Sequence, residues 1–305
     1  MAGEPLAAEP DLGLSAAPEL GRRELLESPA TVRLSMNEIT TYRWSLLQDV
    51  AAYQEAGVGA IGVWRPKLAV FGDERGTDLL RESGLAVSSL AWAGGFTGAN
   101  GHSFLEAVDD ALEAIALAAA LAADCLVLVS GARGGHTANH ARRLLIDALR
   151  RLLDEAADRK VPLALEPMHA MFAEEWTFLN TLDETLEVLD RVDHPYLQVA
   201  FDAYHLWQEP RLLERIPALA ARTASVRLSD WRDPPRSDSD RCLPGDGMIP
   251  LSEIVSAFVE HGYGGYFEIE IWSEELWNSD YVSLLAECRT RFAGLCPDHA
   301  APRSR

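Results

Sequence analysis

The sequence predicts an α/β fold, a single (β/α)8 barrel of parallel strands, and three observations support this prediction. Short apolar runs alternate with longer amphipathic runs from Thr31 onward, and eight such pairs occur. This alternation forces parallel pairing through crossover helices, and eight units close a barrel. Several apolar runs in the second half end on a charged residue, as the strands of a barrel do at an active site. An open doubly wound sheet is the rival fold, but no GxGxxG motif follows the first strand.

The expected elements follow one another along the chain in strict order. Each strand is a short apolar run, and the expected strands are Val32–Met36, Ala60–Val63, Ala86–Ala91, Cys125–Ser130, Leu163–Glu166, Gln198–Asp202, Ser225–Leu228 and Tyr266–Ile271. Each helix carries apolar residues on one face, and the expected helices are Tyr42–Glu55, Leu68–Glu82, Phe104–Ala122, His140–Arg159, Leu182–Arg191, Arg211–Ala220, Ser252–His261 and Ser279–Phe292. Gly57, Gly84 and Gly262 stand where three of these helices should end.

The barrel is expected to span residues 31–296, flanked by two segments of different composition. Residues 1–30 are rich in Ala, Pro, Glu and Gly without an apolar period, which predicts a disordered N-terminal extension. Residues 297–305 predict a loose C-terminal tail. The first segment lacks the basic and apolar regions of a signal peptide, and no run of ~18 apolar residues predicts a membrane span.

Charge and cysteine usage limit the partners and the compartment. The net charge of −20 argues against a nucleic-acid-binding surface, which needs basic patches. Four scattered cysteines without a CxxC pair indicate a reducing environment, so we expect a cytoplasmic protein. The oligomeric state stays open, and a homo-oligomer is one alternative.

Charged residues end the last four strands, where a barrel would bring them together. They are Glu166, Asp202, Arg227 and Glu270. Converging carboxylates can hold a divalent metal or move protons at carbon. Glu268 and Glu270 share one face of their strand, and Glu270 lies nearer its carboxyl end. Glu270 is therefore expected at the rim, with Glu268 one layer deeper or paired with a cation.

Further side chains at strand ends are candidates for binding a substrate, although packing or turn formation would explain any one of them. They are His205, His169 and His136, which follow three of the strands, and Trp64 and Arg65, which follow the second. Arg227 is a further candidate, because its guanidinium could bond either a neighbouring carboxylate or an anionic oxygen of the substrate. Whether the substrate carries a phosphate stays open, because no basic cluster marks a phosphate site. The candidates for such a site are Arg65, Lys67 and Arg133.

Several motifs in the right order carry a family resemblance. Among them are Leu163-Ala-Leu-Glu166-Pro, Phe201-Asp202-Ala-Tyr-His205 and Gly262-Tyr-Gly-Gly-Tyr-Phe-Glu-Ile-Glu270. From Val32 to about Arg291 the chain resembles the sugar phosphate isomerase/epimerase family of xylose isomerase-like TIM barrels. That superfamily also contains ketose 3-epimerases and inosose and dehydroshikimate dehydratases.

The resemblance implies roles for individual residues. Glu166, Asp202 and Glu270 match the family's carboxylate ligands for a divalent metal, and Glu166 and Glu270 match its proton-transferring pair. His205 matches a position that contacts substrate or metal. Arg227 departs from the pattern, because the family has a histidine ligand there and a guanidinium cannot ligate. Either Mn²⁺ or Mg²⁺ binds through the carboxylates with water, Asp230 or His205, or Arg227 replaces the metal.

The sequence therefore predicts an isomerase or epimerase of carbohydrate metabolism. It would transfer a proton at the carbon beside the carbonyl of a small polyhydroxylated substrate. A dehydratase of a keto-polyol is an alternative within the lyases, since its first step is the same proton loss. A non-catalytic barrel that has lost its metal site is the alternative from another class.

Overall fold

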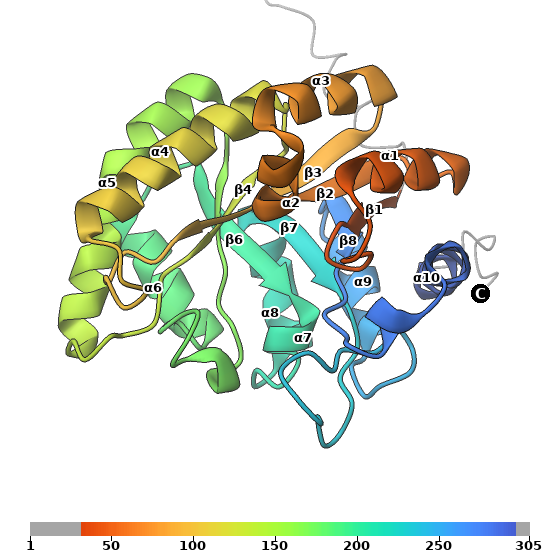
Figure 1. Cartoon of the computed structure of the whole chain (residues 1–305). Helices are drawn as coiled ribbons and strands as arrows, with labels where there is room; N and C mark the ends of the chain where they lie inside the picture. Colours follow the sequence, from red (N-terminus) through yellow and green to blue (C-terminus); the bar gives the residue numbers. More distant parts are fainter. Residues whose placement is uncertain (1–31, 297–305) are drawn as a thin grey trace, which may run out of the picture. The chain divides into compact units, whose positions relative to one another are not determined.

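The computed structural model describes residues 32–296 and shows a closed barrel of eight parallel strands, β1 to β8 in chain order (Figure 1). The strands are β1 (Arg33–Asn37), β2 (Ala60–Trp64), β3 (Ala86–Gly94), β4 (Leu126–Val129), β5 (Leu163–Leu165), β6 (Leu197–Asp202), β7 (Thr223–Leu228) and β8 (Tyr266–Ile269). The predicted fold class is confirmed. The extension and the tail predicted for residues 1–30 and 297–305 lie outside the described residues.

Helices follow the strands and cover the outside of the barrel (Figure 1). They are α1 (Leu46–Glu55), α2 (Arg65–Phe71), α3 (Asp73–Ser83), α4 (Phe104–Ala120), α5 (Ala138–Arg159), α6 (Leu182–Val192), α7 (Ala203–Leu206), α8 (Leu212–Leu219), α9 (Leu251–Glu260) and α10 (Tyr281–Leu295). Short 3-10 helices span Ala170–Phe172, Ala220–Arg222 and Leu276–Asn278. No helix among residues 32–296 has both the length and the apolar character needed to span a bilayer.

The structure differs from the sequence prediction at three helices, for local reasons. The helix expected over Leu68–Glu82 is broken into α2 and α3 at Gly72, whose φ of 102° is open only to glycine. The helix expected from Tyr42 begins at Leu46, because Ser45 forms a capping box with Gln48. The short helix α7 was not predicted. Asp202 begins it by accepting a hydrogen bond from the Tyr204 backbone N–H.

One layer of the barrel interior is polar. Strand register places Asp202 beside Arg227, Arg227 beside Glu268, and Glu268 beside Ser35 on neighbouring strands. Partners at one level of a barrel face the same way, so these side chains meet inside it. Gly62 on β2 leaves the space that this layer needs, because a Cβ there would lie 2.6 Å from the Glu268 carboxyl group. This layer of inward-facing side chains is therefore charged, whereas apolar side chains usually fill the interior of such a barrel.

Candidate active site

The carboxyl ends of β5 to β8 bring together the four charged residues that the sequence predicts there. Glu166 and Glu270 directly follow β5 and β8, while Asp202 and Arg227 lie in β6 and β7, and all four are buried. Arg227 Nη1 lies 3.1 Å from Glu166 Oε1 and 3.0 Å from Glu270 Oε2. One guanidinium nitrogen thus bridges the two carboxylates.

Glu268 lies below this bridge and holds Arg227 from the other side. Its Oε1 is 3.6 Å from Arg227 Nε. Its carboxylate accepts hydrogen bonds from Asn37 Nδ2 at 2.6 Å, Ser88 Oγ at 2.6 Å and Ser89 Oγ at 2.8 Å. Because neutral donors satisfy most of its lone pairs, Glu268 is a fixed anion that orients Arg227 rather than a group facing the pocket.

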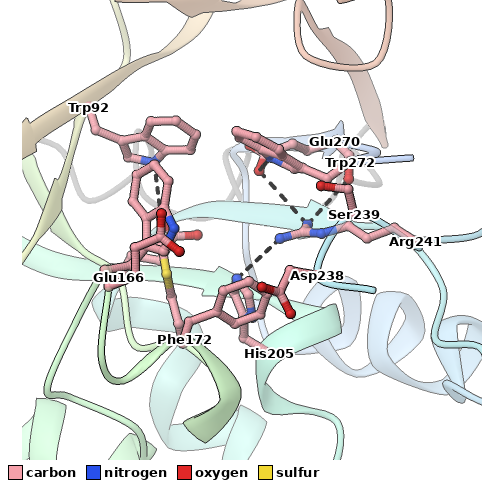
Figure 2. A pocket seen from close by; sticks show the side chains of 12 residues that line it. Trp92, Glu166, Phe172, His205, Asp238, Ser239, Arg241, Glu270 and Trp272 are labelled. Carbon is pink, nitrogen blue, oxygen red and sulfur yellow. Dashed lines mark hydrogen bonds and ion pairs between the residues drawn. The ribbon is translucent and has the colours of Figure 1, made fainter. Parts of the chain in front are cut away.

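A second arginine, Arg241, completes the site and was missed in the sequence. It comes from the loop between β7 and α9, and its Nη1 donates to Asp202 Oδ2 at 2.8 Å. Its Nη2 lies 3.1 Å from His205 Nε2, which accepts the hydrogen bond because a guanidinium only donates (Figure 2). Arg241 is as buried as its partners, so the site holds two fixed cations among four carboxylates.

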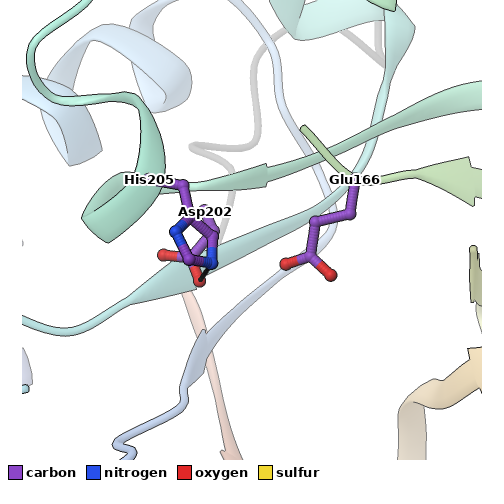
Figure 3. A group of neighbouring side chains, drawn as sticks. All are labelled: Glu166, Asp202 and His205. Atoms are coloured by element: carbon purple, nitrogen blue, oxygen red, sulfur yellow. Dashed lines mark ion pairs between the residues drawn. The ribbon is translucent and has the colours of Figure 1, made fainter. Parts of the chain in front are cut away.

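Glu166, Asp202 and His205 form a group that could hold a metal ion, with ligand atoms within 4.8 Å of one another (Figure 3). Two observations oppose a metal in the arrangement present. Asp202 Oδ2 and His205 Nε2 both accept hydrogen bonds from Arg241, and the Arg227 guanidinium stands where the family resemblance implies a histidine ligand. Metal binding here requires Arg241 to release both ligands, so the donor set does not fit an ion as it stands.

Burial and neighbouring charges set the protonation of the site. Burial raises the pKa of Glu166 to about 7; Glu270 and Asp202 also raise it, while Arg227 lowers it. Burial also raises the pKa of Glu270, against the opposing effect of both arginines. The pKa of Asp202 is lowered, because the charges of Arg241 and Arg227 and the hydrogen bond from the Tyr204 backbone N–H together outweigh its burial. Burial, reinforced by Arg241, lowers the pKa of His205 to about 3, so the imidazole is neutral.

A small cavity, here called the inner pocket, opens above these groups and encloses about 230 Å³. Its lining includes Glu166, Glu270, His205 and Arg241 (Figure 2). Two indole N–H groups fix the carboxylates, since Trp92 Nε1 lies 3.2 Å from Glu166 Oε2 and Trp272 Nε1 lies 3.1 Å from Glu270 Oε1. Arg227 is not part of this lining, so it acts on the carboxylates from below rather than facing a substrate.

The structure places the other predicted substrate-binding residues outside the inner pocket. Trp64 and Arg65 line a larger neighbouring cavity of about 730 Å³, here called the outer groove. His136 bonds the Thr97 carbonyl oxygen at 3.1 Å and lines neither cavity. His169 caps the 3-10 helix Ala170–Phe172 and packs against the Trp231 ring, so it supports the pocket wall without lining it. His205 alone among the predicted histidines reaches the pocket.

Comparison with known proteins agrees with this fold. The xylose isomerase-like TIM barrel family matches residues 50–289. An inosose isomerase of Bacillus subtilis is 26% identical over 146 residues, which are 47% of this chain and 49% of that protein. A D-psicose 3-epimerase of Enterocloster bolteae is 26% identical over 165 residues, 47% of this chain and 52% of that protein. The chain thus spans about half the length of these curated relatives. A solved protein of Sinorhizobium meliloti 1021 is 32% identical, with a TM-score of 0.81 over 86% of this chain and 98% of that one.

Proposed function

This chain belongs to the xylose isomerase-like TIM barrel family, and from that premise we propose that it is a sugar isomerase or epimerase. The reaction would move a proton at the carbon beside the carbonyl of a small polyhydroxylated substrate. One observation carries the proposal: Glu166 and Glu270 both line the inner pocket while sharing one buried guanidinium. Two carboxylates in one pocket can remove and return a proton.

The proposed proton transfer assigns a role to each group of the pocket. Glu166, with a pKa of about 7, takes the proton, and the electrons of the C–H bond move to the carbonyl oxygen. Arg241 lines the pocket and would stabilise the enediolate oxygen through its guanidinium. Glu270 returns a proton to the same carbon in an epimerisation, which restores the carbonyl. In an isomerisation it protonates the former carbonyl carbon instead, and the proton of the adjacent hydroxyl group passes to the former carbonyl oxygen. Arg227 is a positioning residue that limits the repulsion between the carboxylates.

We propose that the two arginines supply the positive charge for which the family resemblance predicts Mn²⁺ or Mg²⁺. A bound metal would be held by Glu166, Asp202 and His205 and would supply Lewis-acid polarisation of the carbonyl. Two of these ligands are bound to Arg241 instead. We therefore expect the purified protein to contain well below one equivalent of divalent metal, measured by inductively coupled plasma mass spectrometry. One tightly held equivalent that survives chelation would contradict this assignment.

The pH dependence of proton abstraction tests the role of Glu166. A base must be ionised, and the raised pKa means that Glu166 loses its charge as the pH falls through about 7. We expect kcat/KM to fall about tenfold per pH unit below that value. Deuterium incorporation from D2O beside the carbonyl of ketoses and inososes, followed by NMR, measures the step even when the product has not been identified. A rate that stays constant between pH 7 and pH 5 would argue against Glu166 as the base.

Loss of water from a keto-polyol is the second candidate, because its first step is the same proton abstraction. The raised pKa of Glu270 favours it, since a carboxyl group that holds its proton more tightly than usual is better suited to donate one to a leaving hydroxyl. Product analysis separates the two reactions: an enone forms only by elimination. If none of the ketoses and inososes tested shows either deuterium exchange or a product, the non-catalytic barrel is favoured.

A further inference from the structure

The two cavities are neighbours divided by tryptophan side chains. Trp92, Glu175, Trp176 and Trp272 line both the inner pocket and the outer groove. The Trp92 ring centroid lies 5.3 Å from that of Trp176 and 5.7 Å from that of Trp272. The inner pocket, at about 230 Å³, is the smaller of the two cavities, and the outer groove has about 730 Å³. A substrate that extends from the inner pocket past these indoles enters the outer groove.

The charges around both cavities oppose an anionic substrate. The inner pocket is lined by four carboxylates, Glu166, Glu175, Asp238 and Glu270, against one cation, Arg241, which is already bound to Asp202. The outer groove has four carboxylates, Asp73, Glu106, Asp110 and Glu175. Like charges at close range repel, and a low-dielectric wall strengthens the effect.

The three cations that could have bound a phosphate are not available to one. Arg65 lines the outer groove but forms a two-point ion pair with Asp110, at 2.8 and 2.9 Å. Lys67 is buried, and its Nζ lies 2.6 Å from Asp49 Oδ2. Arg133 is exposed and lines neither cavity. Binding a phosphate would require breaking an existing ion pair.

Aromatic and polar groups in the outer groove fit a second sugar ring. The indoles of Trp64, Trp92, Trp176 and Trp272 all line it, and aromatic faces pack against the C–H faces of sugars. Asn100 and the carboxylates Glu106 and Glu175 provide acceptors for sugar hydroxyls. The groove thus combines flat apolar surfaces with hydrogen-bond acceptors, and among its described residues it has no lysine and no arginine other than the paired Arg65, with His102 as its one further basic side chain.

We propose that the substrate is an uncharged glycoside. Its reacting ring lies in the inner pocket, and its second sugar ring lies in the outer groove against the tryptophans. This inference rests on the proposed function, which makes the reacting ring a sugar with a carbonyl group. What is new is that the substrate has a second sugar ring and carries no phosphate group.

NMR titration of the intact protein with three probes tests the proposal: D-fructose, its galactoside lactulose, and D-fructose 6-phosphate. We expect lactulose to bind roughly tenfold more tightly than D-fructose, as one additional aromatic stacking contact would give. We expect D-fructose 6-phosphate to bind at least about tenfold more weakly than D-fructose because of charge repulsion. Equal affinities for D-fructose and lactulose would contradict a binding site for a second sugar ring. Binding of D-fructose 6-phosphate as tight as that of D-fructose, or tighter, would contradict an uncharged substrate.

Substitution of single tryptophans tests where the second sugar ring binds. Trp64 lines the outer groove but not the inner pocket, so Trp64→Ala should bring the ratio of lactulose to D-fructose affinity close to one. Trp64→Phe keeps a stacking face and should retain most of that ratio. Trp44 packs edge-on against Tyr281 and lines neither cavity, so Trp44→Ala should leave the ratio as it is. A ratio that Trp64→Ala does not change would overturn the placement of the second ring against Trp64.

Deuterium exchange separates failure of this inference from failure of the proposed function. Exchange into D-fructose without a preference for lactulose would support proton transfer and overturn the second subsite. A preference for lactulose without exchange in either sugar would support the subsite and contradict the reaction. No binding of either sugar would count against both.

Discussion

Replacing Glu166 with glutamine is expected to lower the rate of deuterium exchange by ~10²–10⁴-fold. Glutamine keeps the shape of the side chain and can still bond Trp92 Nε1 through its carbonyl oxygen, but it cannot accept a proton from carbon. Glu270→Gln should cause a loss of the same order, because Glu270 is the second group that faces the substrate. Exchange into the best substrate, measured at saturating concentration, gives the effect on the chemical step.

Glu268→Gln is the matched control, since Glu268 lies on the same strand face as Glu270 but does not line the pocket. The change weakens the anion that pairs with Arg227, and disrupting a buried pair costs roughly 3–5 kcal/mol when one partner is removed. We therefore expect a lower unfolding midpoint and a smaller loss of rate than for Glu166→Gln. Similar mild losses of rate in all three variants would mean that none of these carboxylates transfers the proton.

Replacing Arg227 with histidine is expected to turn the site into a metal centre. The guanidinium that bridges Glu166 and Glu270 would be replaced by a neutral ligand of the type that the family resemblance implies there, and the carboxylates would lose their shared cation. Calorimetric titration with Mn²⁺ should then show at least about tenfold tighter binding than in the wild type, a gain of ~1.4 kcal/mol. The metal should also raise the unfolding temperature of the variant, because a ligand that binds only the folded state stabilises it.

Arg227→Met serves as the control for this experiment. Methionine fills similar space without charge or a hard ligand, so it leaves buried carboxylates uncompensated and should destabilise the protein by roughly 3–5 kcal/mol. Mn²⁺ should restore less of that stability than in the histidine variant. If the wild type binds Mn²⁺ as tightly as Arg227→His does, the arginine does not occupy the metal position. The ion would then be held by Glu166, Asp202 and His205, the group that spans 4.8 Å.

The barrel and its charged strand ends were predictable because both appear as regular patterns of apolar and polar residues along the sequence. An alternation of strand and helix fixes the topology, and a charged residue that ends an apolar run stands out against it. Glu166, Asp202 and Glu270 were found in this way, and the two-residue period of a strand also placed Glu268 one layer below Glu270.

The features that the sequence did not predict lie in irregular loops or depend on how deeply a side chain is buried in the barrel. Arg241 lies in an irregular loop, 39 residues after Asp202, and no sequence period connects the two. The nearest signal was its place just before the glycine-rich run Leu243-Pro-Gly-Asp-Gly. The split between α2 and α3 could have been read from Gly72, which interrupts an otherwise helical pattern. Whether Arg227 faces a substrate or lies beneath the carboxylates depends on side-chain packing, which strand alternation does not determine.

The tryptophans at the cavities give the protein a built-in optical reporter. Four of its eight tryptophans line the inner pocket or the outer groove, and two of these bond Glu166 and Glu270 through their indole nitrogens. Indole emission depends on the polarity and charge of its surroundings. Displacement of water from the groove and protonation of either carboxylate should therefore change the fluorescence spectrum directly. Candidate ligands can then be screened by the protein's own emission, without a label or a coupled assay.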